Sequence, residues 1–134
     1  MAGKLIADQI EHSTAGSLDT QYVVNGSAKA WTRFDPSTNT ELDSLNQSSR
    51  SDDGTGLCTV NFTNSFNNAN HAGVNNCAIG TAPSTGNGAN IGSVFGQTTT
   101  LTKLAYGYSG NNGGTTWALY DYENQKAVIH GDLA

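Results

Sequence analysis

The chain has 134 residues, the size of a single domain, and it carries a net charge of −5 with only 13% charged residues. Without a basic stripe to neutralise phosphates, the charge pattern excludes nucleic acid as an expected partner. No apolar stretch approaches the roughly 18 residues that cross a bilayer, so no membrane insertion is expected.

The composition favours a folded β protein with a thin core. Only 36% of the residues are hydrophobic, 16 are Gly, and Ser, Thr and Asn are similarly abundant. Disordered chains are poor in aromatic residues, whereas this one has two Trp, five Tyr and four Phe in recurring apolar clusters. The chain is therefore expected to fold as one unit.

The first 21 residues are predicted to form an extended N-terminal arm. Leu5, Ile6 and Ile10 fit either a short helix or an alternating extended segment, and the run STAGS at residues 13–17 ends both. An extended segment can add a strand to an open sheet edge of a larger assembly, so these three apolar residues are candidate anchoring residues. The apolar run in residues 1–8 is too short for a signal peptide, so secretory export is not expected.

From residue 22 onward, short apolar segments alternate with turn signals, which is typical of antiparallel strands. Residues 22–24 are predicted as a strand that ends in an Asn25-Gly26 turn. Residues 41–49 break strict alternation and are predicted as one bulged strand or two short pieces. The alternation in residues 28–34 predicts two faces, with Ala28, Ala30, Thr32 and Phe34 on one and Lys29, Trp31 and Arg33 on the other.

The two cysteines, Cys58 and Cys77, lie in strand-like segments at residues 57–62 and 71–79. If these segments form a hairpin around an Asn67-Asn68 turn, the cysteines face each other, near the ~5.5 Å Cα separation of a disulfide. The alternative is a pair of reduced thiols that pack as small apolar residues.

The C-terminal half supplies a long loop and the last strands. Residues 81–92 are predicted as an exposed loop, and strands are predicted within residues 94–108, 117–122 and 127–130. Short strands at this spacing indicate an all-β fold. We therefore expect a single antiparallel, jelly-roll-like β-sandwich domain over residues 22–134, preceded by the arm.

No catalytic, cofactor or metal site is expected. The three His, at positions 12, 71 and 130, lie in different settings, and the cysteines lack the paired spacing of a zinc site. Asp52-Asp53 is interpreted as part of a turn at residues 52–56. Asp121 and Glu123 are interpreted as flanks of a strand, with paired carboxylates of a glycosidase as the alternative.

Aromatic side chains gather in the last third of the chain. Aromatic faces flanked by Gly and Asn suit sugar or protein recognition, and alternate members of the set could equally be core residues. Trp117 is assigned to the core. The candidate receptor or partner surface consists of Tyr106, Tyr108, Tyr120 and Tyr122.

Three segments carry a resemblance to a known family. They are STAGSLDTQYVVNGSAKAW at residues 13–31, DDGTGLCTVNFTNSF at residues 52–66 and NHAGV at residues 70–74. Together they resemble tail-fibre-like and other virion surface proteins of tailed bacteriophages. The resemblance implies a structural virion protein, without enzymatic activity, that displays an outward β domain as a fibre tip, appendage or capsid decoration. It also implies a homotrimer that contacts other capsid or tail proteins and contributes to host attachment, with a host surface glycan as a further partner.

Two other classes of function remain as alternatives. A carbohydrate-binding module of a bacterial surface protein would use the exposed tyrosines, and a small glycosidase would require the carboxyl groups of Asp121 and Glu123.

Overall fold

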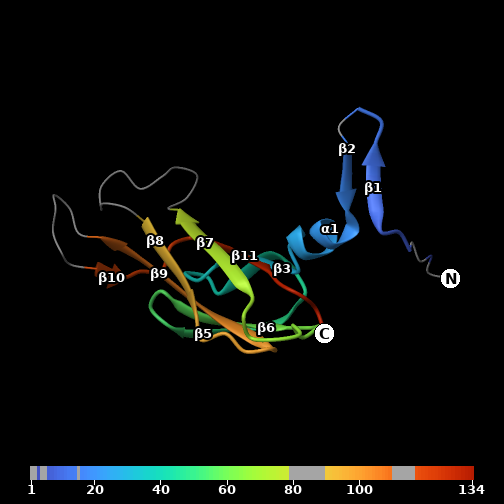
Figure 1. The fold of residues 1–134 in the computed structure, drawn as a ribbon. Helices are drawn as coiled ribbons and strands as arrows, with labels where there is room; N and C mark the ends of the chain where they lie inside the picture. The colour runs from blue at the N-terminus through green and yellow to red at the C-terminus, as the bar shows by residue number, and fades with distance from the viewer. Residues whose placement is uncertain (1–2, 4–5, 15, 79–89, 110–116) are drawn as a thin grey trace.

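The computed structural model shows two antiparallel β-sheets packed face to face, with an arm that projects from them (Figure 1). It describes residue 3 and residues 6–14, 16–78, 90–109 and 117–134. The prediction of an all-β antiparallel sandwich is confirmed. The predicted loop at residues 81–92 falls largely outside the described residues, and its last three residues belong to a strand.

The first sheet has four strands in the order β4-β3-β11-β7. Its outer strands are β4 and β7, and β11 pairs with both β3 and β7. The bounds are β3 (Ala30–Asp35), β4 (Thr40–Leu45), β7 (Ala72–Ala78) and β11 (Asn124–His130).

The second sheet has five strands, and β9 pairs with three of them, β6, β8 and β10. Strand β5 pairs with β6 and forms an edge. The bounds are β5 (Gln47–Gly54), β6 (Leu57–Phe62), β8 (Asn90–Phe95), β9 (Leu101–Ser109) and β10 (Trp117–Leu119).

The core lies between the two sheets and is built from alternate residues of their strands, because successive side chains of a strand point to opposite faces. The predicted division of β3 into two faces is confirmed, and the structure shows that the face of Ala30, Thr32 and Phe34 is the buried one. The hydrophobic core consists of Ala30, Phe34, Cys58, Val60, Phe62, Phe66, Cys77, Leu104, Tyr106, Tyr122, Ala127 and Ile129.

A single residue carries the chain from one sheet to the other between β4 and β5. Asn46 has a φ of 57°, in the left-handed region that Asn tolerates better than most residues. Its side-chain oxygen also accepts a hydrogen bond from the backbone nitrogen of Asn64 at 2.7 Å. Residues 41–49 were predicted as one bulged strand or as two short pieces, and the second prediction is therefore correct.

The hairpin predicted for residues 57–62 and 71–79 is wrong. Strand β6 pairs with β5 and β9, whereas β7 pairs with β11 in the other sheet. The reason is the connecting segment, in which Phe66 is buried and bridges to Leu133, so the chain crosses between the sheets instead of turning back. Cys58 and Cys77 therefore do not face each other across a hairpin, and both are buried thiols.

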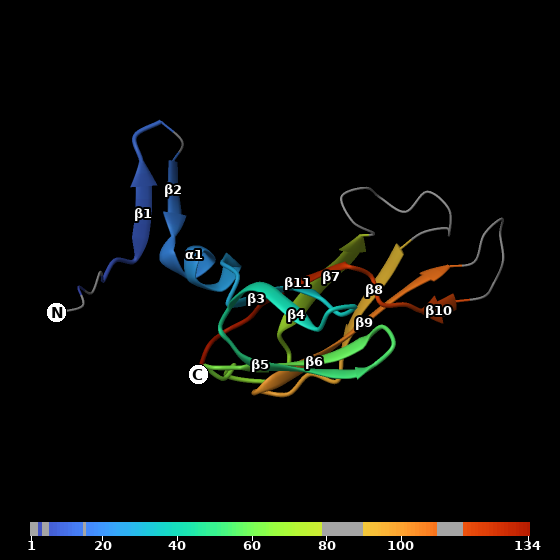
Figure 2. The same cartoon turned by 180° about the vertical axis from the view of Figure 1, so that it is seen from behind.

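The N-terminal arm contains a two-stranded hairpin and one short helix, which stand away from the sandwich in both views (Figures 1 and 2). The hairpin pairs β1 (Gln9–His12) with β2 (Gly16–Asp19), and α1 covers Thr20–Gly26. The strand and turn predicted for residues 22–26 are thus replaced by helix, which ends where the backbone nitrogen of Ser27 donates to the oxygen of Val23. The predicted boundary between arm and domain, after residue 21, falls inside α1.

Candidate functional site

Two of the four tyrosines proposed as a receptor surface belong to the core. Tyr106 and Tyr122 are fully buried, and the hydroxyl of Tyr106 donates to the backbone oxygen of Lys126 at 3.2 Å. Burial raises the pKa of both hydroxyls, most strongly that of Tyr106. Tyr106 is inward because it continues the inward alternation of Thr102 and Leu104 along β9.

The other two tyrosines lie beside each other, with Tyr120 at the surface and Tyr108 half-buried against the core. The rings of Tyr108 and Tyr120 are 6.1 Å apart in an edge-to-face arrangement, and 44% of Tyr120 is exposed. Behind them, the ring of Tyr122 lies 4.9 Å from that of Tyr120. Tyr120 supplies the exposed part of this aromatic pair, and an exposed ring of this kind can stack on sugars or on protein side chains. The side chain of Trp117 lies outside the described residues.

The candidate carboxylates are engaged in local structure. Asp121 accepts a hydrogen bond of 2.6 Å from the backbone nitrogen of Gly56, which ties the segment after β10 to the β5–β6 turn. Asp52 accepts one of 2.9 Å from the nitrogen of Gly54. The interpretation of Asp52-Asp53 as part of a turn is wrong, because both residues lie on β5 and the turn that follows is formed by Thr55 and Gly56.

The three histidines lie in separate places. His71 is buried between Phe62 and Phe66, and the Phe66 ring is 4.5 Å away. Burial lowers the pKa of His71. His130 is half-buried on β11, and His12 is on β1 in the arm. Within the described residues, no three His, Cys, Asp or Glu side chains are grouped so that they could hold a metal ion.

The sequence did not point to the outward face of the four-stranded sheet, where four apolar side chains form a row across the strands. Trp31 pairs with Leu45 on one side and with Val128 on the other, and Val128 pairs with Val74. Val74 is 70% exposed, Leu45 is 47% exposed, and Trp31 is half-buried. We call Leu45, Trp31, Val128 and Val74 the apolar row. A monomer rarely exposes a contiguous apolar surface without a partner for it.

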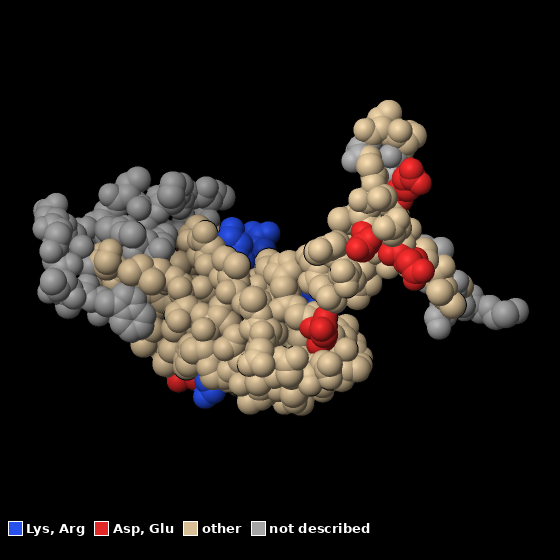
Figure 3. All heavy atoms as spheres, in the orientation of Figure 1, with Lys and Arg blue, Asp and Glu red and all other residues tan. Residues whose placement is uncertain are grey.

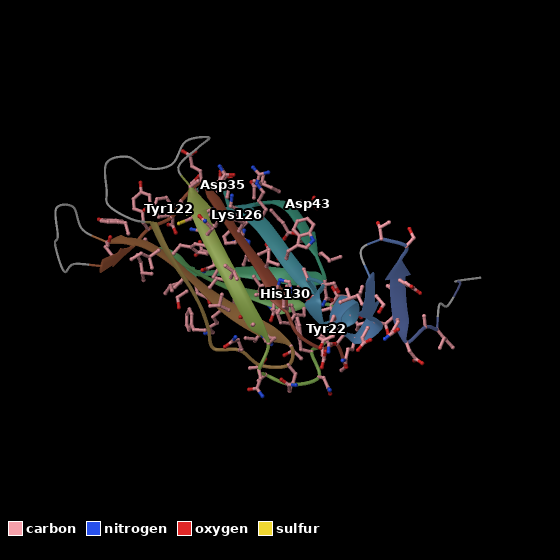
Figure 4. The ribbon with its side chains drawn as sticks, turned by 45° about the horizontal axis from the view of Figure 1, so that its top comes forward. Tyr22, Asp35, Asp43, Tyr122, Lys126 and His130 are labelled. Carbon is pink, nitrogen blue, oxygen red and sulfur yellow. The ribbon has the colours of Figure 1, made fainter. Side chains whose placement is uncertain are left out.

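Two basic residues lie next to the apolar row. Arg33 and Lys126 are paired across β3 and β11. Arg33 lies two residues after Trp31 on β3, and Lys126 lies two residues before Val128 on β11, so all four share one face of the sheet. Together with Trp31, Val74 and Val128, the two basic residues border a groove of about 370 Å³ in the sheet surface. Figure 4 shows Lys126 toward the end of the sheet that lies away from the arm, whereas His130 lies nearer to the arm.

The arm is the second exposed apolar surface. Ile10 and Leu18 are paired across the hairpin, and about half of each side chain is exposed. Helix α1, all seven residues of which are described, buries none of them. Leu5 lies outside the described residues. The exposed large apolar residues of the arm are Ile6, Ile10, Leu18, Tyr22, Val23 and Val24.

The arm is also acidic. Asp8, Glu11 and Asp19 lie in residues 6–26, which contain no Lys or Arg. Figure 3 shows acidic groups in red along the arm, apart from the blue basic groups of the sandwich. The arm and the outward face of the four-stranded sheet therefore share exposed apolar groups. The sheet face carries both signs of charge, because Asp43 pairs with Arg33.

Comparison with protein-family models, curated proteins and solved structures finds no match for this chain. Within the described part of the chain, no helix has the length and apolar character needed to cross a membrane. The candidate site therefore depends on the geometry of the molecule. The signal for it in the sequence was the presence of large apolar residues at outward strand positions, but only the strand register shows that they are adjacent.

Proposed function

We propose that this protein is a structural component of a tailed-phage virion. Its arm attaches the β-sandwich to neighbouring virion subunits, and the rest of the sandwich faces outward as a fibre tip, an appendage or a capsid decoration. The proposal also includes a homotrimeric assembly and a contribution to host attachment through a surface glycan. It follows the resemblance in residues 13–31, 52–66 and 70–74.

The observation that carries the proposal is the exposed arm. An isolated two-stranded hairpin is marginally stable in water, and so is an isolated helix of seven residues. In this arm the hairpin is followed directly by the helix. The hairpin, the helix and the preceding Ile6 expose six large apolar side chains. Such a segment gains order and buries apolar surface when it docks on another subunit, which is what an attachment segment does.

The proposal includes no catalytic step. The carboxylate of Asp121 accepts a hydrogen bond from the backbone nitrogen of Gly56, and the carboxylate of Asp52 accepts one from that of Gly54 at the end of β5. His71 is packed against two phenylalanine rings. These residues have structural roles that account for their positions.

The test is the location of the protein in purified particles. Virions purified by gradient centrifugation are examined by mass spectrometry and by gold labelling with an antibody against the sandwich. A phage replication protein serves as the negative control. We expect the protein at a fixed place on the particle and in a constant copy number. Its absence from purified virions would contradict the proposal.

A second candidate, a carbohydrate-binding module, is favoured by the exposed ring of Tyr120, which lies beside the half-buried ring of Tyr108. Aromatic platforms of this kind stack on sugar rings. Binding of the protein to a glycan array, lost in Tyr120→Ala and retained in Tyr22→Ala, would support this function. No binding above the background of an unrelated β-sandwich would reject it.

A further inference from the structure

We infer that Asn25 is a site of spontaneous deamidation, a modification that converts its side-chain amide to a carboxyl group between the arm and the sandwich. Asn25 and Gly26 are the last two residues of α1, and β3 begins at Ala30. We call residues 25–29 the joint. The inference concerns the chemistry of the joint and does not depend on the proposed function.

The reaction takes place between the two adjacent residues. The backbone nitrogen of Gly26 attacks Cγ of Asn25, and the new N–C bond closes a succinimide ring. The bond from Cγ to the side-chain nitrogen breaks, and this nitrogen leaves as ammonia with the proton that the nitrogen of Gly26 loses. Water then opens either carbonyl of the ring, which gives aspartate or isoaspartate at position 25. Because both reacting groups are held in one short segment, the first step is intramolecular and the only other reactant is water.

The two residues are open to solvent. Asn25 and Gly26 are exposed, and a β-carbon built at Gly26 would have no neighbour within 4 Å. The backbone nitrogen of a glycine is unhindered because the residue has no side chain. Within the described residues, Asn25 is the one asparagine that precedes a glycine. Its side-chain amide makes no hydrogen bond to any described residue, so the side chain is free to turn toward the backbone.

Helix α1 restrains the reaction only weakly. A helical backbone holds the nitrogen of Gly26 away from Cγ of Asn25, so the last turn has to open before the ring closes. The helix has seven residues, buries none of them and has no side-chain hydrogen bond at its N-cap, Asp19. Isolated helices of this length are marginal in water, and segments with few buried contacts open locally at a low cost in free energy. The reactive geometry is therefore reached often.

The joint also has room for the ring and for water. Asn25 borders a hollow of about 240 Å³ together with residues of the sandwich. The residues around it, most of them polar, are Asn25, Asn68, Asn70, His71, Gly131 and Asp132. Water therefore has access to the succinimide from the side of the sandwich as well as from bulk solvent.

The products change both the charge and the length of the joint. Aspartate and isoaspartate each add a negative charge at the C-terminal end of α1, where the helix dipole is also negative. Isoaspartate carries the main chain through its side chain, which inserts a methylene group between the arm and the sandwich. Lys29 spans the same segment, because its Nζ donates to the backbone oxygen of Val24 and, at 2.6 Å, to the hydroxyl of Ser27. Deamidation therefore loosens the segment that sets the direction of the arm.

The test follows the purified full chain by peptide mapping during incubation at pH 8. Trypsin releases residues 5–29, in which Asn25 is the single asparagine, and residues 34–50, in which Asn39 and Asn46 are not followed by glycine. The second peptide is the internal control, because hydrogen bonds hold both of its asparagine side chains. Chromatography with mass spectrometry quantifies the asparagine, aspartate and isoaspartate forms of each peptide.

Two further Asn-Gly pairs, at residues 87–88 and 112–113, lie outside the described residues. They fall in other tryptic peptides, so they do not contribute to the signal from residues 5–29.

We expect residues 5–29 to deamidate at least about tenfold faster than residues 34–50, with isoaspartate among the products. Gly26→Ala is expected to slow the reaction at Asn25 at least about tenfold, because a β-carbon hinders the attacking nitrogen. Asn25→Gln is expected to leave residues 5–29 unmodified at position 25, because the longer side chain has to close a larger ring. Equal deamidation of the two wild-type peptides would overturn the inference, and so would an unchanged rate in Gly26→Ala.

The effect on the joint is measured by brief trypsin digestion of the native chain before and after incubation. We expect cleavage after Lys29 to be at least about threefold faster in the incubated wild type, because the loosened joint opens more often. Gly26→Ala incubated in the same way is the matched control, since it keeps the other two Asn-Gly pairs. Equal cleavage of fresh and incubated wild type would overturn the effect of the modification on the joint.

Discussion

Asn75 on β7 reaches across to Ser93 on β8, where its side-chain amide donates a hydrogen bond of 3.0 Å to the backbone oxygen. The same amide donates to the oxygen of Ala105 on β9 at 3.2 Å. Strand β7 belongs to the four-stranded sheet, and β8 and β9 belong to the five-stranded sheet. These two hydrogen bonds therefore join the two sheets along one side of the sandwich.

The close approach of Asn75 predicts that Gly92→Ala is destabilising. A β-carbon at position 92 would stand 2.1 Å from the side-chain oxygen of Asn75 and 2.6 Å from its Cγ. Because the amide is held by two hydrogen bonds, its displacement breaks them, and we expect a loss of about 1–3 kcal/mol in the free energy of unfolding. Urea denaturation followed by tyrosine and tryptophan fluorescence measures it.

The control for this prediction is Gly26→Ala, since a β-carbon there meets nothing within 4 Å. The unfolding midpoint of the sandwich should stay unchanged in that variant. Adding Asn75→Ala to Gly92→Ala should cost less than the sum of the two single effects, because the clash disappears with the Asn75 side chain. Additive effects would mean that the two residues do not meet.

His71 predicts a loss of stability at mildly acidic pH. Burial lowers its pKa from the ordinary value of 6.5, so the unfolded chain binds a proton at this position more readily than the folded one. The free energy of unfolding therefore falls as the pH drops through 6.5 toward the lowered value, by at most about 1.4 kcal/mol per pH unit for one proton. Thermal unfolding at pH 8 and pH 5.5 measures the change.

The comparison that isolates His71 is His71→Phe, which keeps a ring against Phe62 and Phe66 but does not titrate. The loss of stability between pH 8 and pH 5.5 should be smaller in this variant than in wild type. An unchanged pH dependence would show that His71 contributes nothing to it. Replacing His12 of the arm with Gln is expected to leave the pH dependence of the sandwich as it is in wild type.

Both cysteines are predicted to react with thiol reagents only when the sandwich opens. Burial raises the pKa of Cys58 to about 12 and that of Cys77 to about 11. The thiolate is the reactive form, so a disulfide-exchange reagent at pH 8 should label two thiols per chain in denaturant and label them much more slowly in buffer. Fast labelling in buffer would contradict the burial of the thiols. A mass lower by two hydrogens than that of the reduced chain would contradict the presence of two free thiols.

Arg50 is predicted to stabilise the sandwich through its contacts with Phe34 and Asn39. Its guanidinium carbon lies 4.3 Å from the centre of the Phe34 ring, and its Nη2 donates to the side-chain oxygen of Asn39 at 2.7 Å. Arg50→Ala removes both contacts and uncovers Phe34, so we expect a loss of about 1–2 kcal/mol in the free energy of unfolding. Arg33→Ala, at an exposed position on β3, is the control and should cost less than about 0.5 kcal/mol. Equal costs would show that the contact with Phe34 contributes nothing.

Local patterns in the sequence predicted the parts of the fold that depend on neighbouring residues. The alternation in residues 28–34 placed Ala30, Thr32 and Phe34 on one face and Trp31 on the other, and the structure buries the first face. The irregular alternation in residues 41–49 allowed one bulged strand or two short pieces, and the structure has the second, with the break between β4 and β5 at Asn46. These features follow from the two-residue period of a strand, which holds whatever the strand pairs with.

Segments with two compatible local structures were predicted less well. Residues 22–26 have an apolar run followed by Asn-Gly, which suits a strand and turn, and they form a helix instead. The tyrosines of the last third were read as a single surface, although Tyr106 lies inside and Tyr120 outside. Composition identified where aromatic residues gather, but it could not assign each ring to a face.

The sequence by itself determined that this protein is an antiparallel β-sandwich, because alternating apolar residues and frequent turn signals permit little else. The tertiary structure decided which strands pair: β6 with β5 and β9, and β7 with β11. The backbone donors and acceptors of a strand are the same for every sequence, so the local residue pattern does not specify which distant strand is its partner. That pairing separated Cys58 from Cys77 into opposite sheets, and it aligned Trp31, Val128 and Val74 from three distant strands into one exposed row.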